Sequence, residues 1–386
     1  MRDGSRPTEA EVRSPAPLGR RVLLAPITVT PSKPLTPSHL KGLLWTDVMY
    51  RATAQLADVT YRYSPTTYHR TEQTLGFWEY LDRTVGDADY SGLSEERIGE
   101  MYVGFRTEGR RADAAALRPY ADAVELHGWV HPASTRVLEL WAAHYKQLGM
   151  HDPGLLAHQP PGLGLEEVVD RLGSLGMCLD LRSYGGPVFL DATRHGLPLR
   201  QIVDAQSRPN YLACALRELV PLAPQFDEIV LLYDRELEPD YLLLERTLSA
   251  FGATVRRVTL GRVPIDGQIR SARHGDWHGH TAAALLGGAA AEYDEEVLRL
   301  GMRLYFIAVL GPGQQQSFGH DVLRQSLTRA ARLLSGGRDT DPAPLPEVMA
   351  RHRGDHLYVN PYRLTSSLLA KRRPAPAHGL LTAVYL

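Results

Sequence analysis

The sequence predicts an α/β fold in which a parallel sheet is built from two halves. Two strand–helix–strand patterns lead to this prediction, one beginning at residue 22 and the other at residue 226. Each opens with an apolar run, as strands buried on both faces do, and continues into a segment with helical periodicity. Two such units are typical of a Rossmann-like, doubly wound sheet, whose ligands bind outside the carboxyl ends of the strands. A peripheral insertion and a C-terminal helical segment are expected around it.

The first half begins with a short buried strand at residues 22–24, and the chain then turns through three prolines, Pro31, Pro34 and Pro37. A helix is expected over residues 39–56, with Ser38 at the N-cap, and a strand over residues 58–63. A helix N-terminus after a tight turn presents N–H groups and a positive dipole to an anion. The sequence therefore predicts a polyphosphate site here, where four polar side chains crowd together: Lys33, Thr36, His39 and Lys41.

The second half follows the same plan. Residues 226–233 form an apolar strand after a polar start, residues 241–251 a helix that Gly252 ends, and residues 255–260 the next strand. Between and after the halves, helices are expected at 134–149, 165–175, 211–219, 291–310 and 319–335, and short strands at 187–191 and 202–203.

Four segments are expected. Residues 1–20 read as a disordered tail and residues 21–265 as a nucleotide-binding catalytic domain, with an irregular insertion at about 66–130. Residues 266–338 form a glycine-bearing basic loop and a helical segment. Residues 339–386, with several prolines, are expected to be a linker and a short tail.

Bulk composition excludes several classes of protein. Forty-three Lys and Arg against 44 Asp and Glu argue against a chain that coats nucleic acid non-specifically. Two cysteines, Cys178 and Cys214, are too few for a disulfide scaffold or a cysteine-based zinc site. No apolar run approaches the roughly 20 residues of a membrane span, and the N-terminus lacks the apolar centre of a secretion signal. The expected location is the cytoplasm.

Two loops carry a family resemblance. Lys33-Pro34-Leu35 leads into Thr36-Pro37-Ser38-His39, and far downstream stands Ile269-Arg270-Ser271-Ala272-Arg273-His274-Gly275. These stretches resemble the two signature loops of class I aminoacyl-tRNA synthetases, most closely those of the arginyl-tRNA synthetase core. The resemblance covers about residues 20–335 and includes the order and spacing of the second strand–helix–strand unit.

The resemblance implies ATP as a substrate, with Mg²⁺ bridging its phosphates, and attack of a carboxylate on the α-phosphate. Lys33 would bind the β- and γ-phosphates, and His39 would donate to the α-phosphate with weaker help from Thr36. Arg270, Ser271 and Arg273 would close over pyrophosphate. Nucleotide contacts are implied for Ser38, Asp234, Glu236 and Gly275, and amino-acid contacts for Thr30, Asp204, Tyr211 and Glu218.

Several positions depart from the family pattern. Thr36 and Ser38 stand where the family has histidine and glycine, and Ile269 stands at the leading lysine of the second loop. Ala215 stands at the family's pocket aspartate, and a guanidinium needs a bidentate carboxylate, so arginine is an uncertain substrate. About 50 residues follow the last core helix, and the sequence offers no obvious anticodon-binding domain, a truncation relative to the family.

Each candidate also has a simpler explanation. His39 could be a capping or surface histidine, Arg270 and Arg273 a solvated loop, and Asp234 or Glu236 the end of a strand. His274, His278 and His280 could bind a metal, but no fourth ligand accompanies them, and no metal site is predicted.

Three functions remain open. The first is ATP-dependent activation of an amino acid or related carboxylate, with transfer to a small amine, amino acid or carrier thiol in a specialised biosynthetic pathway. The second is a truncated arginyl-like synthetase that charges tRNA. The third is a non-catalytic paralogue that binds nucleotide, amino acid or a protein partner.

Overall fold

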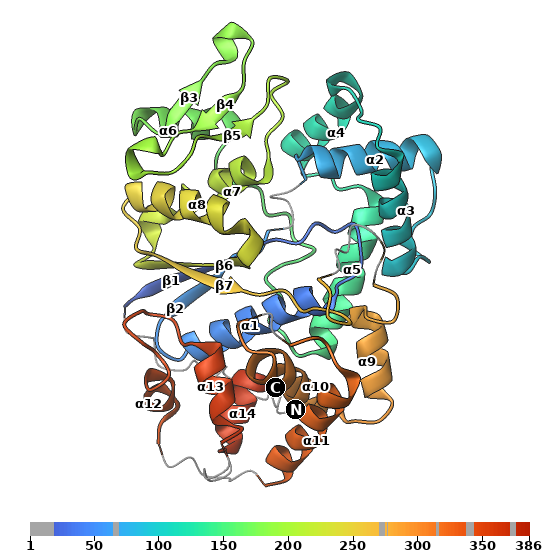
Figure 1. Cartoon of the computed structure of the whole chain (residues 1–386), viewed down its shortest axis with the longest axis vertical. Helices are drawn as coiled ribbons and strands as arrows, with labels where there is room; N and C mark the ends of the chain where they lie inside the picture. Colours follow the sequence, from blue (N-terminus) through green and yellow to red (C-terminus); the bar gives the residue numbers. More distant parts are fainter. Residues whose placement is uncertain are drawn as a thin grey trace, which may run out of the picture.

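The computed structural model describes residues 19–64, 69–269, 275, 277–313, 316–336, 343–370 and 376–386. Its centre is a sheet of four parallel strands in the order β2-β1-β6-β7 (Figure 1). This sheet confirms the predicted fold class. The strands are β1 (Arg21–Pro26), β2 (Asp58–Tyr61), β6 (Glu228–Asp234) and β7 (Val255–Leu260).

The strand order reverses between β1 and β6, which pair in register with Val22 opposite Glu228. From β1 the chain runs outward through α1 (Pro37–Thr53) to β2, and from β6 it runs outward the other way through α8 (Glu238–Ala250) to β7. The connections therefore diverge, and a crevice is left outside the carboxyl ends of the two central strands.

Alternate residues of β1 pack on opposite faces of the sheet. Val22 and Leu24 lie in one apolar cluster with Met49 of α1, whereas Leu23 lies in another with Leu244 of α8. Right-handed crossovers that run in opposite directions along a sheet place their helices on opposite faces. Figure 1 shows α1 below the sheet and α8 above it. The two halves are therefore wound as the sequence predicts.

The segment expected to be irregular, 66–130, is helical over most of its length, so that prediction was wrong. Gly109 and Gly128 end two of its helices in the left-handed conformation, with φ of 66° and 62°. Ser94 and Asp113 cap the starts of the same helices. The helices are α2 (Glu72–Thr84), α3 (Glu95–Glu108) and α4 (Ala114–His127).

Residues 132–219 supply further helices and a second sheet. The helices α5 (Pro132–Gln147), α6 (Leu165–Ser174) and α7 (Tyr211–Leu219) lie where the sequence predicts helices. Three short strands form an antiparallel sheet of their own, β3 (Cys178–Asp180), β4 (Val188–Leu190) and β5 (Arg200–Val203). Two of these strands were expected, but not the separate sheet.

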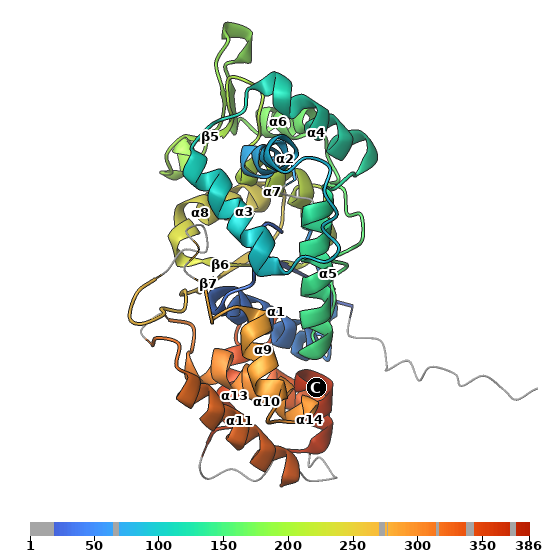
Figure 2. The ribbon, with the colours of Figure 1, turned by 90° about the vertical axis from the view of Figure 1, so that its right-hand side faces the viewer.

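The C-terminal third is helical, and the predicted linker and short tail after residue 339 are wrong for the part that is described. Leu381, Val384 and Tyr385 are fully buried. Figure 2 shows these helices gathered beneath α1, at the opposite end from α2, α4 and α6. The helices are α9 (Ala282–Ala290), α10 (Glu295–Arg303), the π-helical η7 (Leu304–Val309), α11 (His320–Ser335), α12 (Leu345–Ala350), α13 (Pro361–Ser367) and α14 (His378–Tyr385).

The predicted tail at 1–20 lies outside the described residues except for its last two. None of the helices in the described ranges is both long and apolar enough to cross a membrane.

Candidate active site

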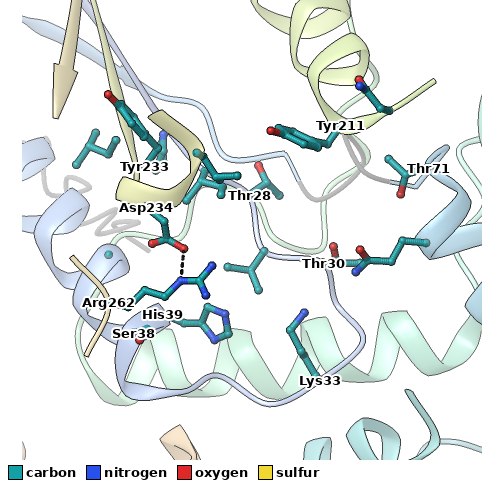
Figure 3. Close-up of a pocket in the computed structure, with 18 of the residues that line it drawn as sticks. Thr28, Thr30, Lys33, Ser38, His39, Thr71, Tyr211, Tyr233, Asp234 and Arg262 are labelled. Atoms are coloured by element: carbon teal, nitrogen blue, oxygen red, sulfur yellow. Dashed lines mark hydrogen bonds and ion pairs between the residues drawn. The ribbon is translucent and has the colours of Figure 1, made fainter. Parts of the chain in front are cut away.

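A cavity of about 490 Å³ lies at the carboxyl ends of β1, β6 and β7, in the crevice where the strand order reverses (Figure 3). The start of α1 forms one wall, and the start of α2 and the connection from β5 to α7 form the other. Most of the site residues predicted from the sequence line this cavity. They are Thr30, Lys33, Thr36, Ser38, His39, Asp204, Tyr211 and Asp234.

The first turn of α1 fixes the histidine. The backbone N–H of Thr36 donates to Nδ1 of His39 over 3.0 Å, which is the role that a glutamate usually plays in a capping box. Because Nδ1 accepts this bond, the neutral ring carries its proton on Nε2. Desolvation, followed by the positive charges of Lys33 and Arg262, lowers the pKa of His39 to about 3. His39 therefore offers a neutral N–H donor to the cavity.

Lys33 supplies a positive charge on the same side. Its side chain is buried, and its Nζ lies 5.3 Å from the ring centroid of Tyr102 on α3. The face of the Tyr102 ring stabilises this positive charge. The inserted helices, which the sequence analysis treats as peripheral, thus help to position a residue of the site.

Two further residues of α1 join its first turn to the chain after β7. Ser38 Oγ accepts a hydrogen bond from the Val263 N–H over 2.9 Å. Lys41 Nζ donates to the carbonyls of Gly261 and Gly313 over 2.8 and 2.6 Å, and burial lowers its pKa to about 8, an effect that Asp234 partly offsets. Lys41 is not among the cavity-lining residues, so it holds the turn in place rather than facing a ligand.

Asp234, at the end of β6, faces the cavity with an arginine that the sequence analysis missed. Nε of Arg262 lies 3.2 Å from its carboxylate, and Nη2 of Arg262 lies 3.0 Å from Glu236. Burial raises the pKa of Asp234, and Arg262 opposes that rise. Glu236 is mostly exposed and does not line the cavity. Arg262 comes two residues after the buried end of β7, and this position near a strand's carboxyl end was the available signal.

The opposite wall is held by paired groups. Asp204 accepts from the backbone N–H of Arg208 and from its Nε, over 2.9 and 2.7 Å. Tyr211 donates its hydroxyl proton to Asp240. Glu218, predicted to contact the amino acid, instead pairs with Arg62 over 2.6 Å and does not line the cavity.

The second signature loop is described only at its ends. Arg270, Ser271 and Arg273 lie outside the described residues, as does His274. Gly275 is described, with a φ of 83°, and is not among the cavity-lining residues. His280 contacts the backbone carbonyl of His278 through Nδ1.

Further lining residues come from segments that the sequence analysis did not connect with the site. Gln73 begins α2 in the insertion, and Gln201 and Arg208 flank the end of the small sheet. No sequence pattern brings these segments to the carboxyl ends of β1 and β6, because their placement depends on how the second sheet packs.

No model of a known protein family matches the sequence, and no curated protein matches it. Among solved structures, the arginyl-tRNA synthetase of Thermus thermophilus is similar, with a TM-score of 0.57 and 16% identity over 88% of this chain and 65% of that chain. Two others have lower TM-scores. A Campylobacter jejuni protein described as an arginyl-tRNA synthetase gives 0.44 (12% identity, 96% and 90% covered), and the Plasmodium falciparum enzyme 0.49 (10%, 83% and 58%).

The chain therefore has an aminoacyl-tRNA synthetase-like fold. The similarity to the Thermus thermophilus structure confirms the fold that the family resemblance implies. At 16% identity this similarity concerns the fold, and the chain spans 65% of the length of that synthetase.

Proposed function

We propose that the protein activates an amino acid or a related carboxylate with ATP, as an acyl-adenylate, and passes the acyl group to an acceptor other than tRNA. One observation carries the first part of this proposal. A single cavity, at the point where the strand order reverses, joins a helix N-terminus bearing Lys33 and His39 to a wall formed by Thr30 and Tyr211. A triphosphate fits the first wall, and a small acid fits the second.

In the proposed reaction, a carboxylate oxygen of the acid attacks the α-phosphorus of ATP, and the bond from that phosphorus to the pyrophosphate oxygen breaks. The protein exchanges no proton in this step, so its contribution is positioning and charge stabilisation. His39 donates Nε2–H to an α-phosphate oxygen, where negative charge increases in the transition state. Thr36 orients the ring through the bond between its backbone N–H and Nδ1.

The remaining nucleotide contacts follow from the same wall. Lys33 lies where it can pair with the β- and γ-phosphates, and the dipole of α1 adds to its charge. Asp234 is placed to accept from the ribose hydroxyls, with Arg262 fixing its carboxylate. Mg²⁺ would enter with the phosphates, since it usually keeps phosphate and water ligands. Arg270, Ser271 and Arg273 are proposed to close over pyrophosphate, and Gly275 to contact the nucleotide.

For the acceptor we propose a small amine, an amino acid or a carrier thiol. This choice is based on how the last described helices pack. Both α13 and α14 contact α1, and α13 also contacts η7, so these helices belong to the core beneath the sheet and do not form a separate anticodon-binding domain. The alternative acceptor is a tRNA, which the related fold also suggests.

Activation is tested by ATP–pyrophosphate exchange with a panel of amino acids and related carboxylates. We expect exchange that depends on at least one of these acids. No exchange with any acid would refute activation and would favour the non-catalytic alternative, in which the fold binds a nucleotide or a protein partner.

The acceptor is tested separately, after the activated acid is known. Labelled acid, ATP and total tRNA should give no acid-precipitable label, whereas hydroxylamine or a thiol should release the label as hydroxamate or thioester. Acylation of tRNA would replace the proposed acceptor with the tRNA alternative and would leave the activation step standing.

A further inference from the structure

Each carboxylate among the described residues that line the cavity is paired with an arginine of the chain itself. Among the described lining residues three are acidic: Glu72, Asp204 and Asp234. Nε of Arg208 lies 2.7 Å from Asp204 and its Nη1 lies 3.7 Å from Glu72, while Arg262 lies 3.2 Å from Asp234. Both arginine side chains are about three-quarters buried. The cavity therefore contains paired charges and no described carboxylate without a guanidinium beside it.

The pairing at Arg208 is held rigidly. Asp204 accepts from the backbone N–H groups of both Gln206 and Arg208 over 2.9 Å, so its carboxylate is fixed by a turn of the chain as well as by the arginine. A cationic ligand could pair with this carboxylate only by displacing Arg208 into a partly buried position without its partners. Removing one member of a desolvated ion pair carries a large penalty, so the wall discriminates against cations.

The same pairing also leaves little attraction for an anionic side chain at this wall. Arg208 is the cation of this wall, and two carboxylates share it. The cavity also contains neutral polar side chains. The side chains of Thr28, Thr30 and Gln73 line the cavity and make no hydrogen bond to other described parts of the chain. Two hydroxyls and a carboxamide can both donate to and accept from a neutral polar group.

We infer that, within the proposed activation reaction, the acid carries an uncharged polar side chain, as asparagine, glutamine, serine and threonine do. Arg208 acts as the specificity-determining residue, because it occupies the carboxylates that would otherwise recognise a lysine or an arginine. This inference rests on the proposed function and adds the substrate class to it.

The test measures equilibrium binding of aminoacyl-sulfamoyl adenosines, which imitate the acyl-adenylate and do not react, so it needs no turnover. The panel comprises the asparaginyl, glutaminyl, seryl, threonyl, aspartyl, lysyl and arginyl compounds and sulfamoyl adenosine itself. We expect the best neutral polar compound to bind at least about tenfold more tightly than the lysyl, arginyl and aspartyl ones.

A charge variant sharpens the test. Arg208→Met, with Arg208→Gln as a second version, frees Asp204, leaves Glu72 with only the exposed Arg111, and should tighten binding of the lysyl or arginyl compound about tenfold. Arg182→Met is the matched control, because Arg182 pairs with Asp180 of β3 and Glu166 of α6, outside the cavity. Its affinities should stay unchanged.

Three outcomes would overturn the inference. Tightest binding of a charged compound by the unaltered protein would refute it and leave activation standing. Unchanged selectivity in both well-folded Arg208 variants would remove Arg208 from the account of specificity. Absence of binding by every compound, including sulfamoyl adenosine, would refute the proposed function together with the substrate class.

Discussion

The two helices that follow the central strands have the same position in their halves of the sheet but opposite chemistry at their N-termini. α1 has no acidic residue in its first turn, and it opens onto the cavity through Ser38 and His39. α8 carries Glu238 and Asp240 in its first turn. Both ends present the positive pole of a helix dipole, yet only the first can accept an anion without repulsion.

The acids of α8 place negative charge at this helix end and have partners of their own. Glu238 accepts from the Tyr233 hydroxyl and pairs with Arg257, and Asp240 lies 2.7 Å from Arg200. A doubly wound sheet therefore provides two equivalent helix ends, and the side chains of the first turn decide which one binds a phosphate. In this chain they favour the first half as the proposed phosphate site.

The largest difference between the halves is expected in stability. α1 is anchored by a fully buried pair, in which Nη2 of Arg303 lies 2.5 Å from Asp47, whereas the Arg257 pairs of α8 are partly exposed. Arg303→Met leaves the Asp47 charge buried without its main partner and should lower the free energy of unfolding by about 3–5 kcal/mol. Arg257→Met should cost about 1 kcal/mol or less.

Urea unfolding followed by circular dichroism measures both variants. Equal losses in the two would contradict the view that the halves are anchored differently. In the double variant Asp47→Asn with Arg303→Met, the loss should shrink, because the uncompensated charge is gone.

The next effect is on activation. His39→Gln keeps an acceptor for the Thr36 N–H, as a capping box does, but removes the Nε2–H donor, so the exchange rate should fall about 100-fold. Lys33→Met keeps the apolar stem against Tyr102 and removes the charge, so it should raise the KM for ATP about tenfold. Both are measured by pyrophosphate exchange with the acid that the panel identifies.

Arg257→Met serves here as the control in the second half and should leave exchange within about twofold, because Arg257 does not line the cavity. A loss of exchange in the control as large as in His39→Gln would show that the first half has no special role.

The smallest effect concerns pH. His69 is buried, and among the described residues neither ring nitrogen has a hydrogen-bond partner. Desolvation, with a contribution from His158, lowers its pKa to about 3. The unfolded chain takes up a proton near pH 6.5 and the folded one does not, so stability is full above pH 6.5 and falls as the pH drops toward 3.

His69→Leu should therefore reduce the pH dependence of the free energy of unfolding by about 1 kcal/mol per pH unit between pH 6 and 4.5. Urea titrations at each pH measure this change. An unchanged slope would show that the ring titrates normally. His39 has a pKa shifted in the same direction but faces the cavity, so its contribution should shrink when a nucleotide is bound.

Local patterns predicted the part of the fold that forms the cavity wall at the start of α1, where the nucleotide is proposed to bind. The apolar runs of β1 and β6 are readable without tertiary information, and so is the convergence of Lys33 and His39 on one turn. The predicted cap at Ser38 was wrong: α1 begins at Pro37 with Thr36 as its N-cap, because proline fits the first helical position. Where patterns were misread, charged residues and prolines were the cause. The segment that contains α2 to α4 has many charged residues, and the proline-bearing segment after residue 339 hides short helices whose buried faces need α1 as a partner.

The opposite wall of the cavity, where the acid is proposed to bind, could not be predicted in the same way. Glu218 lies on α7, as Tyr211 does, but its side chain points toward Arg62. This direction depends on how α7 packs. Arg208 and Gln73 reach the cavity from segments 135 residues apart in the sequence, brought together by the small sheet and the insertion. Only the folded chain reveals that resident arginines occupy the carboxylates of the cavity.

The central claim is that the N-terminus of α1 binds the phosphates, and Ser38→Asp tests it most directly. An aspartate can still accept the Val263 N–H bond, and its charge favours the helix dipole, so the melting temperature should hold or rise. Calorimetric binding of α,β-methylene-ATP should nevertheless weaken at least about tenfold, because the new charge repels the phosphates. Unchanged affinity for this nucleotide in the folded variant would contradict the account.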